Sequence, residues 1–553
     1  MEFKNTLLTP ISLWEDFDDG LPLKSAFVNA IKVDGIVTSE VYFSGRAVDS
    51  DRVRIYGYFS HREQNDAKGV ILYLPAEDEF VGADSFKEFI SEGYSVLAVD
   101  LYGRRDGATN FTEYPESVNY ANLSESGSYK DSVLLSAKET SWYEWVAVGR
   151  YAVKFLKEQG YSSICVVGNK TGANVGWQLV AFDENADCFV ALFGAGWTAY
   201  KGVSKFNENE PIEADEASRK YVAAVDAHAY APYVKRPVLY LTSTNGRFFD
   251  FDRAGDTLTR IDKNTPCFYN CSVGYDESLD VASKNDIVAF LAAYCAKSGC
   301  VMPKNDELTC AESDNFVEFK LNGASDINRV AFYVGEGETD ARSRNWVEYE
   351  VMPDKNGGYS LRYKPDGKGI VFAFASISFE NGITLCTKET FCRTEKKAVK
   401  RTNSKLIYSG KIGLNGLTFI DDETSVGLFA DKKVEEIAGP DDITGAYSAD
   451  GLKSYKLSDE EFSLTDASIL KFDVFAKEYC PLTLTLYEDC NDGSVKKYTE
   501  SIELKAENIW QNALVKISEF KSELGQPVRN YDKITAVSIR SDASFIVNNV
   551  LII

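Results

Sequence analysis

Five short apolar runs, separated by helix-like segments, constrain the fold of the first 300 residues. They do not alternate apolar with polar residues, which is typical of strands buried on both faces of a parallel sheet. The runs are GVILYLPA (69–76), YSVLAVDLYG (94–103), SSICVVGNK (162–170), CFVALFGAG (188–196) and RPVLYLTST (236–244). Segments of helical periodicity lie between them, for example SWYEWVAVGRYAVKFLKEQG ahead of the third run. This order predicts an α/β fold in which helices cover a parallel sheet.

The pattern changes after residue 300. Alternating strands joined by turn sequences such as DKNGG and PDGKG then predict a small immunoglobulin-like β-sandwich. Six further alternating strands, from ILKFDVFAK to FIVNNVLII, predict a jelly-roll β-sandwich. We therefore expect three domains: an α/β domain over residues 1–300, an immunoglobulin-like domain over 301–400 and a jelly roll over 401–553.

Composition excludes several classes of partner. The formal charge of −24 argues against nucleic acid and against an anionic membrane surface. No apolar run approaches the roughly 20 residues that span a bilayer, and the first residues do not have the pattern of a signal peptide. We therefore expect a cytoplasmic protein, or a secreted one if a signal was removed. The 11 scattered cysteines, the two histidines and the lack of a CxxC pair predict neither a metal site nor a cofactor.

The third apolar run ends in Gly168-Asn169-Lys170-Thr171-Gly172 and is followed by the helix-like ANVGWQLVAF. Glycines two residues before and after a central residue are typical of a nucleophile elbow, a strained turn between strand and helix. With YSVLAVDLYG upstream, RPVLYLTSTNG downstream and the insertion GRRDGATNFTEYPESVNYANL, residues 40–300 resemble the α/β-hydrolase family. The closer resemblance is to its acetyl-xylan-esterase and dienelactone-hydrolase-like branch.

The resemblance implies a Ser-His-Asp triad, yet each triad position holds another residue. Lys170 stands at the nucleophile position, and Asn245 and Gly246 stand where the acid should follow its strand. The stretch TPCFYNCSVGYDESLD (265–280), where the base should lie, contains no histidine. These losses predict an inactive, esterase-like protein. An active hydrolase of acylated carbohydrate, with Asp250 or Asp252 as a displaced acid, and a structural scaffold are the alternatives.

Lys170 itself allows three interpretations. A charged Lys170, with Asn169 and Thr171 beside it at the start of a helix, would bind an anion or a sugar. A neutral lysine would form a Schiff base with a carbonyl compound, and a relic would do neither. The two histidines do not complete a site: His61 is expected in a surface loop, and His228 ahead of its strand, at the end opposite a site formed at carboxyl ends.

The last 44 residues resemble galactose-binding-like carbohydrate modules. The resemblance rests on WQNALVKISEF (510–520), ITAVSI (534–539) and FIVNNVLII (545–553). It implies stacking of a sugar on aromatic rings, for which the candidates are Trp510, Tyr487 and Tyr498, although side chains of this kind are more often core or surface residues than ligand contacts. The expected partner is a carbohydrate or a protein, and the oligomeric state is left open.

Overall fold

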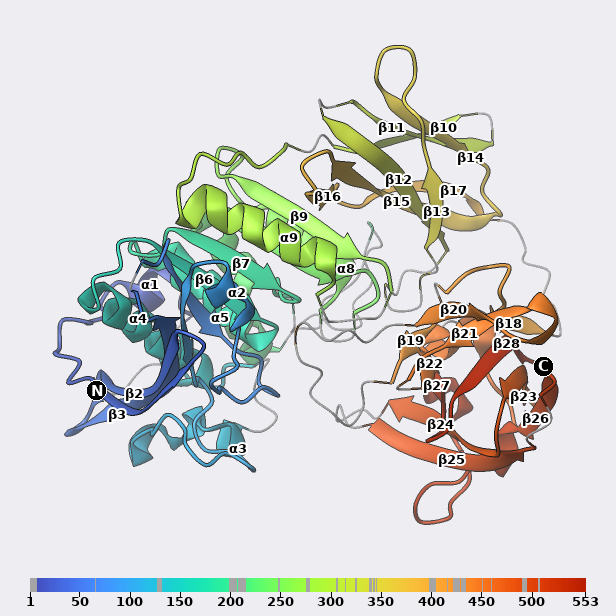
Figure 1. Ribbon diagram of the computed structural model, residues 1–553, viewed down its shortest axis with the longest axis horizontal. Helices are drawn as coiled ribbons and strands as arrows, with labels where there is room; N and C mark the ends of the chain where they lie inside the picture. Colours follow the sequence, from blue (N-terminus) through green and yellow to red (C-terminus); the bar gives the residue numbers. More distant parts are fainter. Residues whose placement is uncertain are drawn as a thin grey trace.

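A computed structural model shows one helix-covered sheet followed by two pairs of β-sheets (Figure 1). The predicted fold class, an α/β unit followed by two β-sandwiches, is confirmed. The structure describes residues 7–64, 66–126, 132–197, 206, 215–246, 249–274, 279–304, 307–313, 315–323, 326–337, 341, 344, 346–396, 404–414, 416–420, 428, 434–449, 451–458, 460–489, 495–505 and 508–553. In this part of the chain no helix is both long and apolar enough to cross a membrane.

The first sheet has nine strands in the order β1-β2-β3-β5-β4-β6-β7-β8-β9. From β1 to β5 neighbouring strands are antiparallel, and from β5 to β9 they are parallel. Five parallel strands fall in the five predicted apolar runs. The strands are β1 (Ala26–Val33), β2 (Ile36–Val48), β3 (Asp51–Arg62), β4 (Val70–Leu74), β5 (Ser95–Val99), β6 (Ile164–Asn169), β7 (Cys188–Leu192), β8 (Val238–Ser243) and β9 (Cys267–Ser272).

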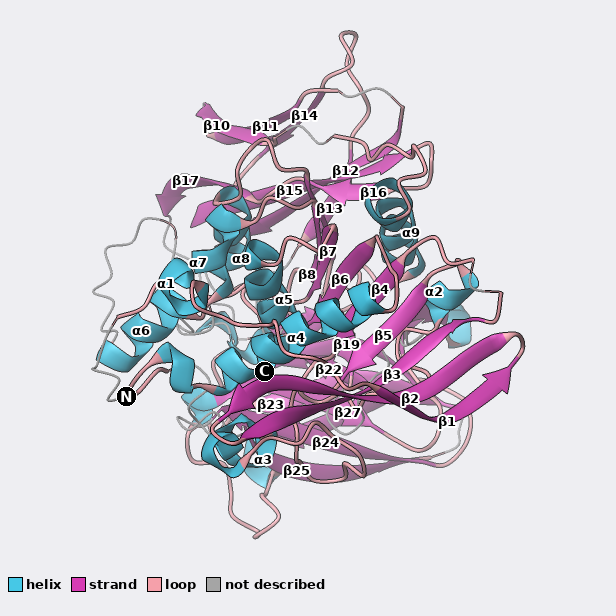
Figure 2. Ribbon diagram, turned by 90° about the vertical axis from the view of Figure 1, so that its left-hand side faces the viewer, coloured by secondary structure: helices cyan, strands magenta, loops and turns pink. Residues whose placement is uncertain are grey.

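Helices cover both faces of this sheet because its central strands are apolar on both sides. Val166 of β6 joins one core cluster with Trp145 and Trp177, while Val167 joins a second cluster. Figure 2 shows α4 and α5 lying across one face. The helices are α1 (Pro10–Trp14), α2 (Glu88–Ser91), α3 (Leu123–Ser126), α4 (Ser141–Glu158), α5 (Thr171–Phe182), α6 (Glu216–Ala224), α7 (Ala227–Tyr230), α8 (Phe251–Thr259) and α9 (Val281–Phe290), the last extended by a π-helix (Leu291–Cys295).

The first β-sandwich packs directly on the α/β unit. Both core clusters of the large sheet continue into it, for example through Trp346 and Phe372 in one and Phe319 in the other. Its sheets have the orders β10-β11-β14 and β13-β12-β15-β16, with β17 also paired to β15. The strands are β10 (Thr309–Ser313), β11 (Phe316–Leu321), β12 (Ile327–Glu336), β13 (Val347–Glu350), β14 (Tyr359–Tyr363), β15 (Lys368–Phe379), β16 (Thr384–Cys386) and β17 (Thr390–Lys396).

The second β-sandwich has its own core, which includes Phe472, Leu484 and Val547. One sheet has the order β20-β21-β28-β23-β26, with β18 on β28, and the other the order β19-β22-β27-β24-β25. The immunoglobulin-like and jelly-roll assignments and the domain boundaries stay predictions. The strands are β18 (Lys405–Tyr408), β19 (Thr418–Phe419), β20 (Glu435–Ala438), β21 (Thr444–Tyr447), β22 (Leu452–Ser454), β23 (Ile469–Ala476), β24 (Cys480–Asp489), β25 (Val495–Leu504), β26 (Gln511–Lys516), β27 (Ile534–Arg540) and β28 (Phe545–Ile552).

Candidate functional site

The turn between β6 and α5 has the geometry that its two glycines predict. Lys170 sits at its tip with φ 49° and ψ −111°, a conformation that L-residues rarely adopt. A Cβ on Gly168 would lie 2.4 Å from the carbonyl oxygen of Gly172, and a Cβ on Gly172 would lie 2.2 Å from that of Leu74. Only glycine allows this close approach of backbones, so the chain makes a nucleophile elbow with a lysine at its tip.

Three consecutive acidic residues after β4 contact the three central residues of the elbow. The Asn169 amide donates to the Glu79 carboxylate at 3.1 Å, and the Thr171 hydroxyl donates to that of Glu77 at 3.3 Å. Lys170 Nζ lies 3.5 Å from a carboxylate oxygen of Asp78, and only 16% of the Lys170 side chain is exposed. All three residues predicted to bind an anion therefore already contact carboxylates of the chain itself.

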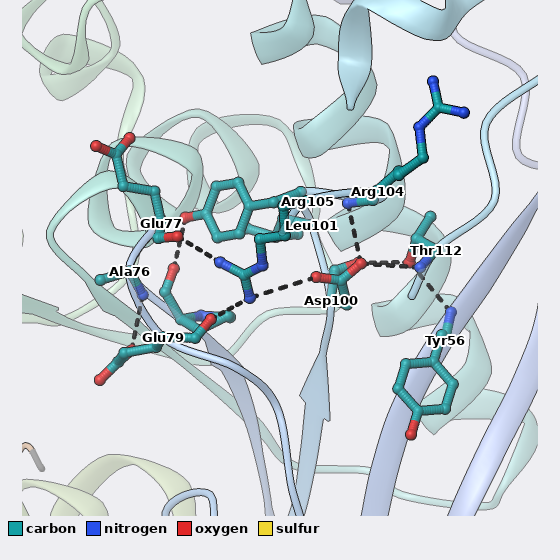
Figure 3. A network of polar contacts seen from close by, with 12 residues as sticks. Tyr56, Ala76, Glu77, Glu79, Asp100, Leu101, Arg104, Arg105 and Thr112 are labelled. Carbon is teal, nitrogen blue, oxygen red and sulfur yellow. Dashed lines mark hydrogen bonds and ion pairs between the residues drawn. The ribbon is translucent and has the colours of Figure 1, made fainter. Parts of the chain in front are cut away.

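Arg105 anchors this acidic loop (Figure 3). Its guanidinium donates to the backbone carbonyls of Glu77 and Glu79, lies 3.9 Å from an oxygen of Asp100, and lies 4.2 Å from the ring centre of Phe80. Asp100 follows β5 and accepts from the amides of Gly103 and Thr112. Burial raises the pKa of Asp100, and these amides and Arg105 act against that shift. The loop is thus held in place from the neighbouring strand.

Glu79 of this loop is half-buried and accepts three hydrogen bonds. It accepts from the Ala76 amide at 2.7 Å and from the Tyr73 hydroxyl at 2.8 Å, besides the Asn169 amide. Burial raises the pKa of Glu79, and the three hydrogen bonds oppose the shift because they stabilise the ionised form. No sequence motif marks Glu77, Asp78 or Glu79. Their signal was available, since AEDEF directly follows an apolar run and carboxyl ends of neighbouring parallel strands lie together.

Asn245, which follows β8, joins the α/β unit to the first β-sandwich. Its buried amide donates to the carbonyl oxygens of Ala341 and Arg344, at 2.9 and 2.8 Å. Its own oxygen accepts from the Thr244 hydroxyl at 2.6 Å, and Gly246 beside it is buried. A carboxylate has no N–H to offer these two carbonyls, so an amide suits this contact with the sandwich and a carboxylate does not.

The two carboxylates considered as displaced acids also have structural contacts. Asp250 caps α8, where its side chain accepts from the amides of Asp252 and Arg253. Asp252 forms two hydrogen bonds, at 2.8 and 3.1 Å, with the fully buried Arg344, whose guanidinium also lies 2.6 Å from Glu389. Burial acts to lower the pKa of Arg344, but the surrounding carboxylates outweigh it and raise that pKa. No local motif marks Arg344 or Glu389, because their partners lie far away in the sequence.

The two histidines differ in place from the sequence expectation. His61 lies in β3, which pairs with β2 as far as Arg62, and is half-buried against Phe59. His228 is buried, with Nδ1 2.9 Å from Asp226 and its ring stacked on Trp197 at 4.2 Å. Since Trp197 follows β7, His228 packs near the carboxyl end of that strand and not at the opposite end of the sheet. Its contacts are those of a helix cap, because Asp226 caps α7.

The aromatic candidates for sugar stacking belong to the packing of the second sandwich. Only 5% of Tyr487 and 1% of Tyr498 are exposed, which leaves a pyranose no access to either ring face. The half-buried Trp510 donates from its indole nitrogen to the carbonyl of Pro440 at 3.1 Å and packs on Gly439. Among the described residues, no group of three or more His, Cys, Asp or Glu side chains could hold a metal ion.

The order of the first sheet, with its antiparallel strands at one side, and the elbow after β6 together define an α/β-hydrolase fold. No family model and no curated protein matches the chain. Solved structures similar to it include an acetyl xylan esterase from Paenibacillus sp. R4, with 13% identity and a TM-score of 0.39, covering 53% of this chain and 98% of that one. A second is acetyl xylan esterase 1 from Thermoanaerobacterium sp. JW/SL YS485, with 11% identity and a TM-score of 0.39, covering 54% of this chain and 96% of that one. A third is a protein from Klebsiella pneumoniae subsp. pneumoniae MGH 78578 provisionally named a dienelactone hydrolase, with 12% identity and a TM-score of 0.31, covering 48% of this chain and 100% of that one.

Proposed function

We propose that this chain is a catalytically inactive, esterase-like protein whose α/β unit serves binding and assembly. One observation carries the proposal: the acid position holds Asn245, whose amide is committed to two carbonyls of the first β-sandwich. A serine-type hydrolase needs a nucleophile, a general base and an acid that orients the base. Here the third of these positions is part of a joint between two folded units.

The nucleophile position supports the same proposal. Lys170 forms an ion pair with Asp78, and an ammonium group has no lone pair with which to attack a carbonyl. An acyl group transferred to this nitrogen would in any case form a stable amide and stop turnover. This argument also disfavours the Schiff base that a neutral lysine would form.

The electrostatics around the elbow oppose ester hydrolysis further. The tetrahedral intermediate of acyl transfer carries a negative oxygen, which hydrolases stabilise with hydrogen-bond donors. In this chain the adjoining loop instead presents Glu77, Asp78 and Glu79 to the elbow residues. An oxyanion formed there would meet like charges. The same charges act against an external anion as the ligand of Lys170.

An active hydrolase with displaced machinery would have to free Asp252 from Arg344, or Asp250 from its helix cap. Removing one partner from a buried ion pair costs several kcal/mol, so this alternative receives no support from the geometry. A scaffold role is compatible with the proposal, because Asn245 connects the α/β unit to the first β-sandwich. The partner, a carbohydrate or another protein, remains part of the proposal.

The test is ester hydrolysis by the purified chain, with aryl acetates and acetylated xylan as substrates, next to the Lys170→Ala variant. We expect the same rate as in buffer for both proteins and no labelling by a fluorophosphonate probe. Steady turnover above the Lys170→Ala rate would overturn the proposal. A glycan array probed with the full chain then separates carbohydrate binding from a protein partner.

A further inference from the structure

Two cavities of the structure flank the hairpin formed by β2 and β3. The first, of about 870 Å³, holds two basic side chains, and each is already paired. Arg46 Nε lies 2.7 Å from the buried Glu144, and Lys138 Nζ lies 2.6 Å from Asp16. This cavity therefore has no uncompensated positive charge to offer a ligand.

The second cavity, of about 820 Å³, lies where β2 ends and β3 begins. Because β3 runs antiparallel to β5, its first residues lie at the edge of the sheet where the parallel strands end. Arg54, near the start of β3, forms a backbone bridge to Glu113, which also lines the cavity. Ligands of open α/β sheets bind outside the carboxyl ends of strands, and this cavity has that position. Its volume is in the range of organic ligands.

Backbone carbonyls hold the arginines of this cavity. Arg52 donates to the carbonyls of Gly45 and Pro22, at 2.9 and 2.7 Å. Arg54 donates to the carbonyl of Lys24 at 3.4 Å, and its guanidinium lies 5.3 Å from the ring centre of Tyr42. Carbonyl acceptors orient a guanidinium but leave its charge in place, whereas a carboxylate would neutralise it.

The charge balance of the cavity is the opposite of that of the chain. The cavity is lined by three basic side chains, Lys24, Arg52 and Arg54, and by two acidic ones, Asp51 and Glu113. These give it a net charge of +1, in a protein whose formal net charge is −24. Within the described part of the chain, no carboxylate oxygen lies within 4 Å of the basic nitrogens of these three residues. The cavity is thus a local positive site on an acidic protein.

We propose that this cavity binds a small organic oxyanion that also carries hydroxyl groups, the chemistry of a sugar acid or hydroxy acid. The carboxylate pairs with Arg54 and Lys24, neither of which has a carboxylate oxygen within 4 Å among the described residues. Ser44 and Ser50, which also line the cavity, exchange hydrogen bonds with the hydroxyl groups. The cavity is separate from the elbow. Ligand binding in the cavity and the lack of esterase activity at the elbow can therefore be tested independently.

The experiment is titration of the full chain with glucuronate, glucose and inorganic phosphate, followed by calorimetry. We expect saturable binding of glucuronate, at least about tenfold weaker binding of glucose because it lacks the anion, and weakening as NaCl rises from about 0.05 to 0.5 M. Absence of saturation with glucuronate, or equal affinity for glucose, would overturn the proposal. If phosphate binds as tightly as glucuronate, the proposal that the ligand is an organic anion is wrong.

Two variants and a matched control locate the site. Arg54→Gln should weaken glucuronate binding about tenfold or more, through loss of a charged hydrogen bond. Arg62→Gln at the other end of the same strand is the control, because backbone carbonyls of Ile90 and Ser91 also hold that guanidinium. It should change the affinity less than about twofold. If Arg54→Gln fails to fold, the exposed Lys24→Gln should still weaken binding several-fold; equal effects of the site and control variants would contradict the assignment.

Discussion

At the scale of single residues, Asn245 joins the α/β unit to the first β-sandwich. An asparagine amide donates two hydrogen bonds, and here both go to carbonyl oxygens of the neighbouring β-sandwich. An aspartate has nearly the same shape but only acceptor oxygens when ionised. The amide therefore suits this position better than a carboxylate, because the acceptor oxygens of a carboxylate would face two carbonyl oxygens in a buried site.

We expect Asn245→Asp to lower the free energy of unfolding by roughly 2–4 kcal/mol, because two buried carbonyls lose their donors and a charge is buried beside them. Urea unfolding followed by tryptophan fluorescence measures the change. The matched control is Asn356→Asp, on an exposed turn, which should change the free energy by less than about 0.5 kcal/mol. Equal stability of Asn245→Asp and the native chain would show that the amide contacts contribute nothing.

At the scale of elements, the unit β6–turn–α5 depends on its glycines more than on the residue at its tip. Gly172 passes so close to the end of β4 that a Cβ would lie 2.2 Å from the Leu74 oxygen and 2.5 Å from that of Pro75. Both obstacles are backbone atoms, which cannot move aside as a flexible side chain can. The elbow therefore persists as a packing device between β4, β6 and α5, whatever chemistry its tip performs.

Gly172→Ala should accordingly destabilise the chain by about 3 kcal/mol or more, or prevent soluble expression. Gly255→Ala is the matched control: this glycine lies inside α8, and a Cβ there would meet nothing within 4 Å. Alanine is the better helix former by up to about 1 kcal/mol, so the control should be neutral or stabilising. Thermal unfolding of both variants decides, and a Gly172→Ala protein as stable as the native chain would contradict the close approach.

At the scale of the whole molecule, a buried carboxyl links the α/β unit to the first β-sandwich. Asp286 of α9 accepts from the backbone amide of Thr384 in β16 at 2.8 Å and from the side-chain amide of Asn270 in β9 at 2.7 Å. Burial raises the pKa of Asp286 to about 7, against these two hydrogen bonds, and Asp280 adds to the rise. Between that pH and the unfolded chain's pKa near 3.8, the native chain holds a proton that the unfolded chain has lost.

This linkage predicts a pH dependence with a definite sign. Between pH about 4 and 7 the native state binds the extra proton, so the contribution of Asp286 to stability falls as pH rises, by at most about 1.4 kcal/mol per unit. Asp286→Asn removes this contribution. The free energy of unfolding of the variant, minus that of the native chain, should therefore be larger at pH 8 than at pH 5. Urea unfolding at both pH values measures it, with Asp106→Asn on an exposed loop as the control. An unchanged pH profile in Asp286→Asn would refute the linkage.

Sequence patterns located the large sheet and the elbow well. The five apolar runs contain β4 to β8, because a strand buried on both faces has to be apolar along its length. They located the contacts of the site poorly. No pattern marks the loop Glu77–Glu79 as part of the site, although it directly follows one of these runs, and the polar sequence around His61 predicts a loop although β3 extends through it.

The sequence by itself determined the architecture: alternating apolar runs and helices require a covered parallel sheet, alternating strands require sandwiches, and paired glycines require the tight turn at Lys170. These are local demands of burial and backbone geometry. Only the tertiary structure decided that Asn245 donates to a loop about 100 residues away, that Arg344 lies between Asp252 and Glu389, and that a cavity lined by three basic side chains opens beside β3. The physical reason is that hydrogen bonds and ion pairs act over a few ångströms in space, and no pattern along the chain records which distant groups the fold brings within that range.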